Sequence, residues 1–332
     1  MPTIYDVAST AGVSPATVSR VLNGRTDVSP ELASRVRQAV QELGYRRNGV
    51  ARNLRRRVTT VWALIITDVG NPFFTAMVRG VEDVAHEAGY SLVLCNSDED
   101  LDKEQRYVEI ALAEQMAGVI IAAASEGASD LSPLVDRGVP VVAVDRRLDR
   151  LDLDTVLVDN VLGAREATSH LLDNGCRRVA CITGPTRTTT AAERLRGFRE
   201  AHQTAGLPVD PALVVRENFK EDGGRRGAEQ LLALDTSPDG LFVANNLMTV
   251  GALEALLDAG AAIPDDVAVV GFDDIPWARL TRPRVTTVQQ PTYEMGRQAA
   301  LLLASRIAAY AGPPRRVVLS PTLQVRESSL RP

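Results

Sequence analysis

Seven short apolar runs, each followed by a helical stretch, constrain the fold of this chain more than any other feature of its 332 residues. Nearly every side chain within a run is apolar, so both faces of the strand that it forms are expected to be buried. Buried strands that alternate with helices form parallel sheets covered on both faces, and seven strands are too many for one comfortable open sheet. The runs are 61–66, 91–95, 118–123, 139–144, 178–183, 241–244 and 267–272.

The start of the chain follows a different pattern, which indicates two short helices joined by a tight turn. Thr3 and Asp6 have the spacing of a capping box, and Gly12 is placed to end the first helix because glycine tolerates a positive φ. The second helix follows at once, with Ser14 as its N-cap and Pro15 as its first helical residue. We therefore predict a helix-turn-helix at the N-terminus.

A third helix, over 29–43, has apolar residues at helical spacing and completes a small core. The outward face of the second helix begins with small residues, which let the backbone approach a base edge or a phosphate closely. Arg20, one turn further on, can reach guanine O6 and N7 with two hydrogen bonds. A three-helix module that binds protein has the same helix pattern. The outward face comprises Pro15, Ala16, Thr17, Ser19 and Arg20.

Charge favours nucleic acid over protein as the partner of these helices. Residues 1–60 hold ten arginines, no lysine and four acids, a net charge of about +6, whereas the whole chain carries −5. A basic head on an acidic remainder concentrates phosphate contacts in one place and keeps the rest of the protein away from the nucleic-acid backbone. The sequence therefore predicts a DNA-binding head.

Four short motifs in this part of the chain carry a family resemblance. They are TIYDVA at 3–8, GVS at 12–14, TVSRVLN at 17–23 and VARNL at 50–54. With them the chain resembles the lactose/galactose repressor (LacI/GalR) family of bacterial transcription regulators, and the resemblance extends over essentially the full chain. It implies a repressor that binds a palindromic operator as a homodimer and responds to a small-molecule effector.

The resemblance also implies which residues contact DNA. The second helix would enter the major groove, and the segment 48–56 would fold into a hinge helix only on operator DNA. Leu54 would wedge into the minor groove at the operator centre, where an apolar side chain bends the duplex by unstacking a base step; the other reading of Leu54 is a buried contact against the third helix. The implied DNA-binding residues are Thr3, Ser14, Pro15, Ala16, Thr17, Ser19, Arg20, Asn23, Ala51, Arg52, Leu54 and Arg55.

For the fold, the resemblance implies a small all-α helix-turn-helix headpiece and an α/β effector domain. The effector domain would consist of two doubly wound parallel-sheet subdomains, as in periplasmic binding proteins, with three crossovers near Asn160, Gln289 and Ser320. The expected domains are a DNA-binding domain at 1–46, a hinge at 47–57 and an effector-binding and dimerisation domain at 58–332. Its N-subdomain would span about 58–160 and 290–320, and its C-subdomain about 161–289 and 321–332.

Polar residues at the ends of the predicted strands are candidates for effector binding, because ligands of open parallel sheets bind beyond the carboxyl ends of the strands. They are mostly hydrogen-bonding groups, which suits a hydroxyl-rich ligand. Phe73 and Phe74 could stack on a flat sugar or base face, or could pack in the core. The positions that match the family's effector residues could instead be helix caps or interdomain bonds. The candidates are Asn71, Phe73, Phe74, Arg146, Asp159, Thr190, Arg194, Phe219, Asn245 and Asp273.

Two positions bear on the chemistry of the effector. The chain has Thr188 and Arg146 where the purine-binding member of the family has an arginine and a tryptophan. A sugar or polyol is therefore favoured over a purine corepressor. A phosphoprotein corepressor is a further alternative within the family.

Other functional classes fit less well. Asp273 and Asp274 could form a catalytic carboxylate pair, but the three histidines lie on predicted helices, and GxSxG, phosphate-loop and HExxH motifs are absent. We therefore expect no enzyme and no cofactor. A transport binding protein would need a signal peptide, which the N-terminus lacks, and would have no use for a basic head.

The remaining expectations concern metal, membrane and assembly. The cysteines 95, 176 and 181 are odd in number and lack metal-ligand spacing, so we expect reduced core thiols rather than a metal or redox site. No run of eighteen apolar residues occurs, which predicts a cytoplasmic protein without a membrane segment. The C-terminus lacks an apolar heptad, so we expect a dimer rather than a tetramer.

Overall fold

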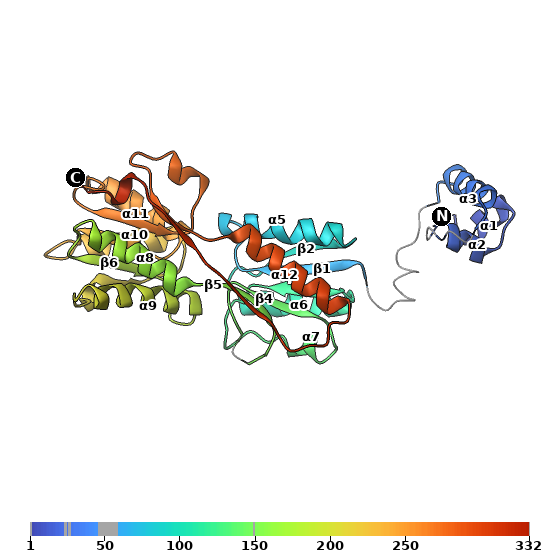
Figure 1. Cartoon of the computed structure of the whole chain (residues 1–332), viewed down its shortest axis with the longest axis horizontal. Helices are drawn as coiled ribbons and strands as arrows, with labels where there is room; N and C mark the ends of the chain where they lie inside the picture. The colour runs from blue at the N-terminus through green and yellow to red at the C-terminus, as the bar shows by residue number, and fades with distance from the viewer. Residues whose placement is uncertain (1, 23–24, 26–27, 46–58, 149, 332) are drawn as a thin grey trace. The chain divides into compact units, whose positions relative to one another are not determined.

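The computed structural model describes residues 2–22, 25, 28–45, 59–148 and 150–331. The chain divides into two compact units, Met1–Val58 and Thr59–Pro332, which are called the head and the body here and are described separately (Figure 1). Several predicted DNA-binding residues lie outside the described residues, as does the predicted hinge. These are Asn23, Ala51, Arg52, Leu54 and Arg55.

The described part of the head contains three helices, α1 (Ile4–Ala11), α2 (Pro15–Leu22) and α3 (Pro30–Glu42). The predicted caps of α1 are confirmed: Thr3 N–H donates to Asp6 Oδ2 at 2.7 Å, Asp6 N–H donates to Thr3 Oγ1 at 3.4 Å, and Gly12 has φ 61°. The predicted helix-turn-helix is therefore confirmed. The inward residues form one core, made of Val7, Ala8, Ala11, Val18, Val21, Val36 and Ala39.

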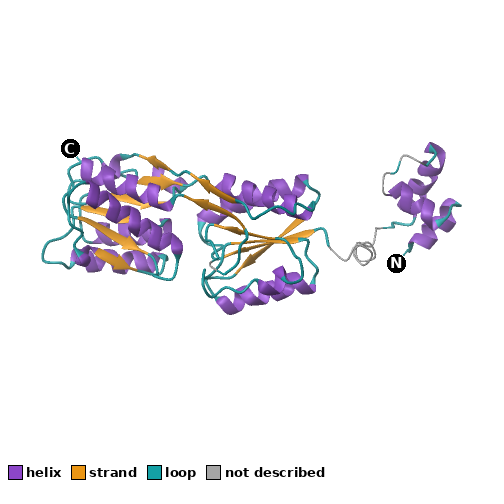
Figure 2. Cartoon of the chain, turned by 60° about the horizontal axis from the view of Figure 1, so that its bottom comes forward, coloured by secondary structure: helices purple, strands orange, loops and turns teal. Residues whose placement is uncertain are grey.

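The body consists of two lobes, each with a six-stranded sheet between two layers of helices (Figures 1 and 2). In the first, called lobe A, the strand order is β11-β5-β4-β3-β1-β2 and all pairs are parallel. Its helices are α5, α6, α7 and α12. The elements of lobe A are β1 (Val61–Ile66), α5 (Pro72–Glu87), β2 (Ser91–Asn96), α6 (Leu101–Ala113), β3 (Gly118–Ile121), α7 (Ser132–Val135), β4 (Val141–Val144), β5 (Asp154–Val158), α12 (Thr292–Ile307) and β11 (Arg316–Leu319).

The second lobe, called lobe B, has the strand order β12-β10-β9-β8-β6-β7. Its pairs are parallel except that the edge strand β12 runs antiparallel to β10. Helices α8 and α9 pack together as one pair, and α10 and α11 as another. The elements are α8 (Asn160–Asp173), β6 (Val179–Thr183), α9 (Thr189–Thr204), β7 (Val214–Arg216), α10 (Glu221–Leu232), β8 (Gly240–Val243), α11 (Asn246–Asp258), β9 (Ala268–Phe272), β10 (Thr286–Gln289) and β12 (Thr322–Gln324), with short 3₁₀ turns at Pro211–Leu213, Pro276–Arg279 and Glu327–Ser329.

The chain passes between the lobes three times, after β5, after β10 and after β11. The two sheets are therefore wound in the same way, and β1, β3 and β4 of lobe A correspond to β6, β8 and β9 of lobe B. The expected architecture, a helix-turn-helix head and two doubly wound parallel-sheet subdomains, is confirmed.

Five strands were not expected from the sequence. Three of them, β5, β10 and β11, carry polar or charged residues within their spans and so interrupt the apolar runs that identified the others. The other two, β7 and β12, are three-residue edge strands, too short to leave a pattern. Among the described residues, no helix is long and apolar enough to cross a membrane.

Candidate functional site

The outward face of α2 is the candidate DNA-binding surface of the head. Val18 and Val21 point into the core, whereas Ala16 and Arg20 are exposed one turn apart. Ser14 Oγ accepts a hydrogen bond from Thr17 N–H at 3.2 Å and so caps the helix. The small residues of the first turn and the arginine of the last turn therefore lie on one accessible face, as an element that enters a major groove requires.

A cleft between lobes A and B is the candidate effector site. Residues from the carboxyl ends of strands in both sheets line it, which is where parallel sheets bind ligands. The lining comprises Thr67, Asp68, Asn71, Phe73, Phe74, Glu99, Asp145, Arg146, Thr190, Arg194, Asn218, Phe219, Lys220, Asn245, Asp273 and Gln290. Most of these side chains are hydrogen-bonding groups, and both acidic and basic ones are present. Three of the residues are aromatic.

Two buried carboxylates occupy corresponding places in the two lobes. Asp145 follows β4 and Asp273 follows β9, and both have a left-handed backbone, with φ 67° and 76°. Non-glycine residues held in this conformation concentrate at ligand sites. Burial raises the pKa of Asp145 to about 6, and burial also raises the pKa of Asp273. The cleft thus holds two carboxylates that are desolvated and would gain from hydrogen-bond donors on a ligand.

Arg194, on α9, is the buried cation of lobe B. Its Nε donates to Asn160 Oδ1 at 2.8 Å, its Nη1 donates to the carbonyl of Ala244 at 2.6 Å, and its Nη1 lies 3.9 Å from Asp273 Oδ2. The guanidinium also lies 3.8 Å from the centre of the Phe272 ring. Burial lowers the pKa of Arg194, and the nearby acids oppose this shift. Arg194 is therefore fixed in one orientation.

Arg146, which follows Asp145, is the buried cation of lobe A. Its Nη1 and Nη2 donate to the two carboxylate oxygens of Glu99 at 2.9 and 2.8 Å, and Nη1 also donates to the carbonyl of Ala123 at 2.9 Å. Burial acts to lower the pKa of Arg146, but the hydrogen bonds and charge of Glu99 outweigh burial and raise it. This is a bidentate pair, the strongest arrangement of an arginine and a carboxylate.

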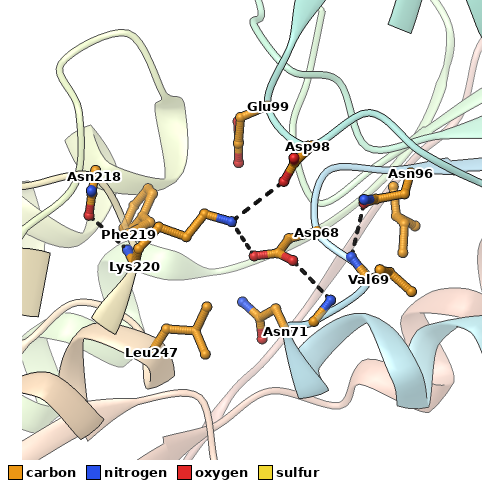
Figure 3. Close-up of polar contacts among 12 residues, drawn as sticks. Asp68, Val69, Asn71, Asn96, Asp98, Glu99, Asn218, Phe219, Lys220 and Leu247 are labelled. Atoms are coloured by element: carbon orange, nitrogen blue, oxygen red, sulfur yellow. Dashed lines mark hydrogen bonds and ion pairs between the residues drawn. The ribbon is translucent and has the colours of Figure 1, made fainter. Parts of the chain in front are cut away.

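Lys220 joins the two lobes at the cleft. Its ammonium group reaches from the start of α10 to the carboxylates of Asp68 and Asp98 in lobe A (Figure 3), forming a short ion pair with Asp68 and lying 3.9 Å from Asp98 Oδ1. A second bridge joins Asn246 Nδ2 of lobe B to Asn71 Oδ1 of lobe A at 2.8 Å.

A third bridge reaches the start of α9 from lobe A. Glu126, in the loop after β3, accepts hydrogen bonds from Thr189 N–H and Thr189 Oγ1, each at 2.6 Å. The N-cap residue of α9, Thr188, makes no capping hydrogen bond to the helix with its side chain. Glu126 therefore caps a helix of the other lobe, and that helix carries Thr190 and Arg194 of the cleft.

The aromatic candidates line the cleft and also pack against other parts of the protein. Phe73 and Phe74, at the start of α5, are both buried in the core of lobe A and also line the cleft, with their rings edge to face. Phe219 has φ 61°, and its ring lies so close to Gly184 that a side chain at that position would collide with it.

Most of the predicted effector residues line the cleft, and one does not. Asp159 instead accepts a hydrogen bond from Leu162 N–H at 2.9 Å and is the N-cap of α8, so the expectation that it faces the effector is corrected. Asn245 lines the cleft but is also the N-cap of α11, and its Nδ2 donates to the carbonyl of Phe219 at 2.8 Å. The nine predicted residues that line the cleft are Asn71, Phe73, Phe74, Arg146, Thr190, Arg194, Phe219, Asn245 and Asp273.

Sequence reasoning missed several lining residues. Asp68 and Asp145 follow apolar runs and had the same strand-end signal as the residues chosen. Lys220 had a weaker signal, as one of only two lysines in the chain. Nothing in the sequence marks Glu99 or Gln290, because their roles depend on residues far along the chain.

The suspected catalytic pair is not formed. Asp274 accepts hydrogen bonds from Arg326 Nη1 at 2.8 Å and from Thr287 Oγ1 at 2.6 Å, and these outweigh burial and lower its pKa, whereas the pKa of Asp273 is raised. The two carboxylates therefore belong to separate networks. The three cysteines are buried and unpaired, and no cluster of metal-ligating side chains occurs within the described ranges.

Comparison with known families and relatives agrees with this architecture. A model described as "Bacterial regulatory proteins, lacI family" matches residues 3–48, and one described as "Periplasmic binding protein-like domain" matches residues 168–329. The chain is similar to the ribose operon repressor of Halalkalibacterium halodurans, with 38% identity over 99% of this chain and 97% of the relative.

Two solved structures resemble the whole chain. The transcriptional regulator CelR in complex with cellobiose is 36% identical, with a TM-score of 0.76 over 99% of this chain and 100% of that one. The lac repressor dimer bound to operator and the anti-inducer ONPF is 25% identical, with a TM-score of 0.89 over 99% of both chains.

Proposed function

This chain belongs to the LacI family of bacterial regulatory proteins, and we propose that it is a repressor that binds a palindromic operator as a homodimer under the control of a sugar or polyol. Its relatives are transcriptional regulators, and the chain is not an enzyme. One observation carries the proposal. A basic helix-turn-helix head is joined in one chain to a two-lobed body whose cleft offers hydrogen-bonding side chains from both lobes.

The proposed division of labour follows from this organisation. The DNA-binding domain comprises residues 1–46, the hinge 47–57, and the effector-binding and dimerisation domain 58–332. In the head, Arg20 reads a base pair, and Leu54 of the hinge enters the minor groove. Positively charged side chains of the head and hinge contact phosphates and make operator binding weaken as salt is raised.

The proposed effector is uncharged or weakly charged and rich in hydroxyl groups. Asp273 and Arg194 offer an acceptor and a donor from lobe B, and Asp145 offers a second acceptor from lobe A. Phe73, Phe74 and Phe219 provide apolar surface for the face of a sugar ring. Relatives named for ribose and in complex with cellobiose support this class of ligand.

Strand β2 supports the homodimer. It is an edge strand of lobe A, it contains no charged residue, and its consecutive side chains Val93 and Leu94 are about 40% and 41% exposed. Uncharged, apolar edge strands are rarely left open to water. The opposite edge strand, β11, begins with the exposed Arg316, and a charge at an edge strand opposes pairing with another chain. We assign β2 to the dimer interface.

Control of DNA binding follows from linkage. An effector that prefers one arrangement of the lobes shifts the two N-subdomains of the dimer relative to each other, which permits or prevents pairing of the two hinges on DNA. Coupling of about 1–3 kcal/mol changes operator affinity by about 5- to 150-fold.

Selection of binding sites from random DNA tests the proposal. The full-length protein should enrich a palindrome and bind it with a stoichiometry of two chains per site. As a control, the variant Arg25→Ala removes an exposed arginine of the head that lies outside α2. This variant should select the same sequence as wild type. Enrichment of no sequence, or of a site without two-fold symmetry, would exclude the proposed repressor.

A further inference from the structure

Each cation that lines the cleft already has an acidic partner in the protein. Arg146 forms the bidentate pair with Glu99, Lys220 forms an ion pair with Asp68, and Arg194 lies 3.9 Å from Asp273. The three cations among the lining residues face four carboxylates, because Asp145 also lines the cleft. An anionic ligand would therefore enter a site whose formal charge is negative and whose three positive groups each lie beside a carboxylate.

The unfilled hydrogen-bonding positions suit an uncharged ligand. Among the described residues, Arg146 Nε and Gln290 Oε1 are buried in the cleft lining without a hydrogen-bond partner, and the first is a donor whereas the second is an acceptor. The carboxylate of Asp145 lies 3.7 Å from Arg146 Nε, beyond hydrogen-bond distance. A hydroxyl group donates and accepts, so hydroxyl groups can satisfy donors and acceptors alike.

Glu99 is held in the position that neutralises Arg146. It follows the end of β2 in a turn where Asp98 and Glu99 both have a left-handed backbone, with φ 58° and 59°. Two consecutive non-glycine residues keep this conformation only where their surroundings impose it. The two carboxylates of the turn contact different cations: Glu99 pairs with Arg146, and Asp98 lies 3.3 Å from Lys103. Asp98 also lies near Lys220 (Figure 3).

We infer that Glu99 makes the cleft selective for an uncharged polyhydroxyl effector over its phosphate ester, because its carboxylate occupies the two guanidinium nitrogens of Arg146 that would otherwise bind a phosphate. A guanidinium recognises carboxylate and phosphate by the same paired geometry, so the two compete for one face. This inference rests on the proposed function in that it takes the cleft to be the effector site. It adds the charge class of the effector and the residue that determines it.

Replacement of Glu99 by glutamine tests the inference on the full-length protein. Isothermal titration compares D-ribose, D-ribose 5-phosphate and inorganic phosphate as probes. Wild type should bind the free sugar in preference to its phosphate ester. In Glu99→Gln, affinity for the phosphate ester relative to the free sugar should rise by about 10- to 100-fold, and binding of inorganic phosphate should appear, because hydrogen bonds to charged groups are strong.

The matched control is Glu109→Gln, which makes the same substitution at an exposed position of α6 outside the cleft lining, and it should keep the preference of wild type. The double variant Glu99→Gln with Arg146→Gln should lose the gained affinity for phosphate. Circular dichroism of each variant establishes that it is folded, and Glu99→Ala serves as a second variant if Glu99→Gln is not.

Two results overturn the inference: tighter binding of D-ribose 5-phosphate than of D-ribose to wild type, or no gain of phosphate binding when Glu99 is replaced. A protein that binds no sugar but gains inorganic phosphate binding in Glu99→Gln, and not in Glu109→Gln, contradicts the sugar effector and supports the role of Glu99. The two proposals therefore fail in distinguishable ways.

Discussion

Replacing Glu126 by alanine should loosen the contact between the two lobes of the body. Glu126 is only 3% exposed, and its carboxylate supplies the cap that α9 lacks within its own lobe. Since α9 carries Thr190 and Arg194, this contact holds part of the lobe B side of the cleft against lobe A.

The size of the effect follows from the two hydrogen bonds, both of 2.6 Å, that Thr189 donates to Glu126. Loss of a side-chain N-cap costs about 0.5–2 kcal/mol, and a hydrogen bond to a charged group contributes about 1.5–3 kcal/mol. Both ranges refer to one contact. We expect Glu126→Ala to destabilise the joined arrangement of the lobes by about 2 kcal/mol. This changes the equilibrium between joined and separated lobes by about 30-fold. An effector that binds only the joined lobes would lose affinity by up to the same factor.

Amide hydrogen exchange of the full-length, effector-free protein measures this directly. In Glu126→Ala the amides at the start of α9 should exchange about 30-fold faster than in wild type. The matched control is Glu221→Ala, which removes an exposed acid from the first turn of α10 and should leave α9 unchanged. Equal protection of α9 in Glu126→Ala and wild type would refute the assignment of Glu126 as a cap between lobes.

Three further predictions concern the head, the dimer and the fold. Arg20→Ala should relax sequence preference at one base pair of each half-site by about 1–3 kcal/mol, measured as a binding-site profile, and an unchanged profile would remove its role. Leu94→Asp should convert the dimer to monomers in sedimentation analysis, whereas Val318→Asp on the opposite edge strand should not; a dimeric Leu94→Asp protein would place the interface elsewhere. Asp154→Asn should lower the free energy of unfolding by about 3 kcal/mol at neutral pH, since it breaks a buried pairing with Arg306 and Arg315. Burial acts to raise the pKa of Asp154, but these arginines hold it well below its usual range, so the stabilisation is present above about pH 4 and is lost as the pH falls; acid denaturation that is identical in the variant and wild type would contradict this.

The parts of the fold that local sequence determines were predictable. The caps of α1 and α2 depend on residues within four positions of each other, and the buried strands of both sheets depend on runs of apolar side chains. Strands β7 and β12 were not predictable because each has only three residues and takes its place from a neighbouring strand.

The sequence predicted residues of the cleft only where they follow a recognisable strand. Asp145 and Asp159 both follow a strand, yet only Asp145 lines the cleft; Asp145 has φ 67°, whereas Asp159 has φ −77° and caps α8. The sequence does not distinguish these two backbone conformations. Glu99 and Lys220 depend on the packing of segments that are distant in the chain, which no local pattern encodes.

In the proposed function, a small molecule in the cleft controls operator binding. Fluorescence anisotropy on the selected palindrome, at fixed salt, should be repeated with a panel of sugars, polyols, sugar phosphates and purines for wild type and Asp273→Ala. We predict that an uncharged sugar or polyol changes operator affinity of wild type by about 5- to 150-fold, and that Asp273→Ala binds the operator normally but no longer responds. A response that persists unchanged in Asp273→Ala, or one given only by purines or phosphate esters, would contradict control by an uncharged sugar or polyol in the cleft.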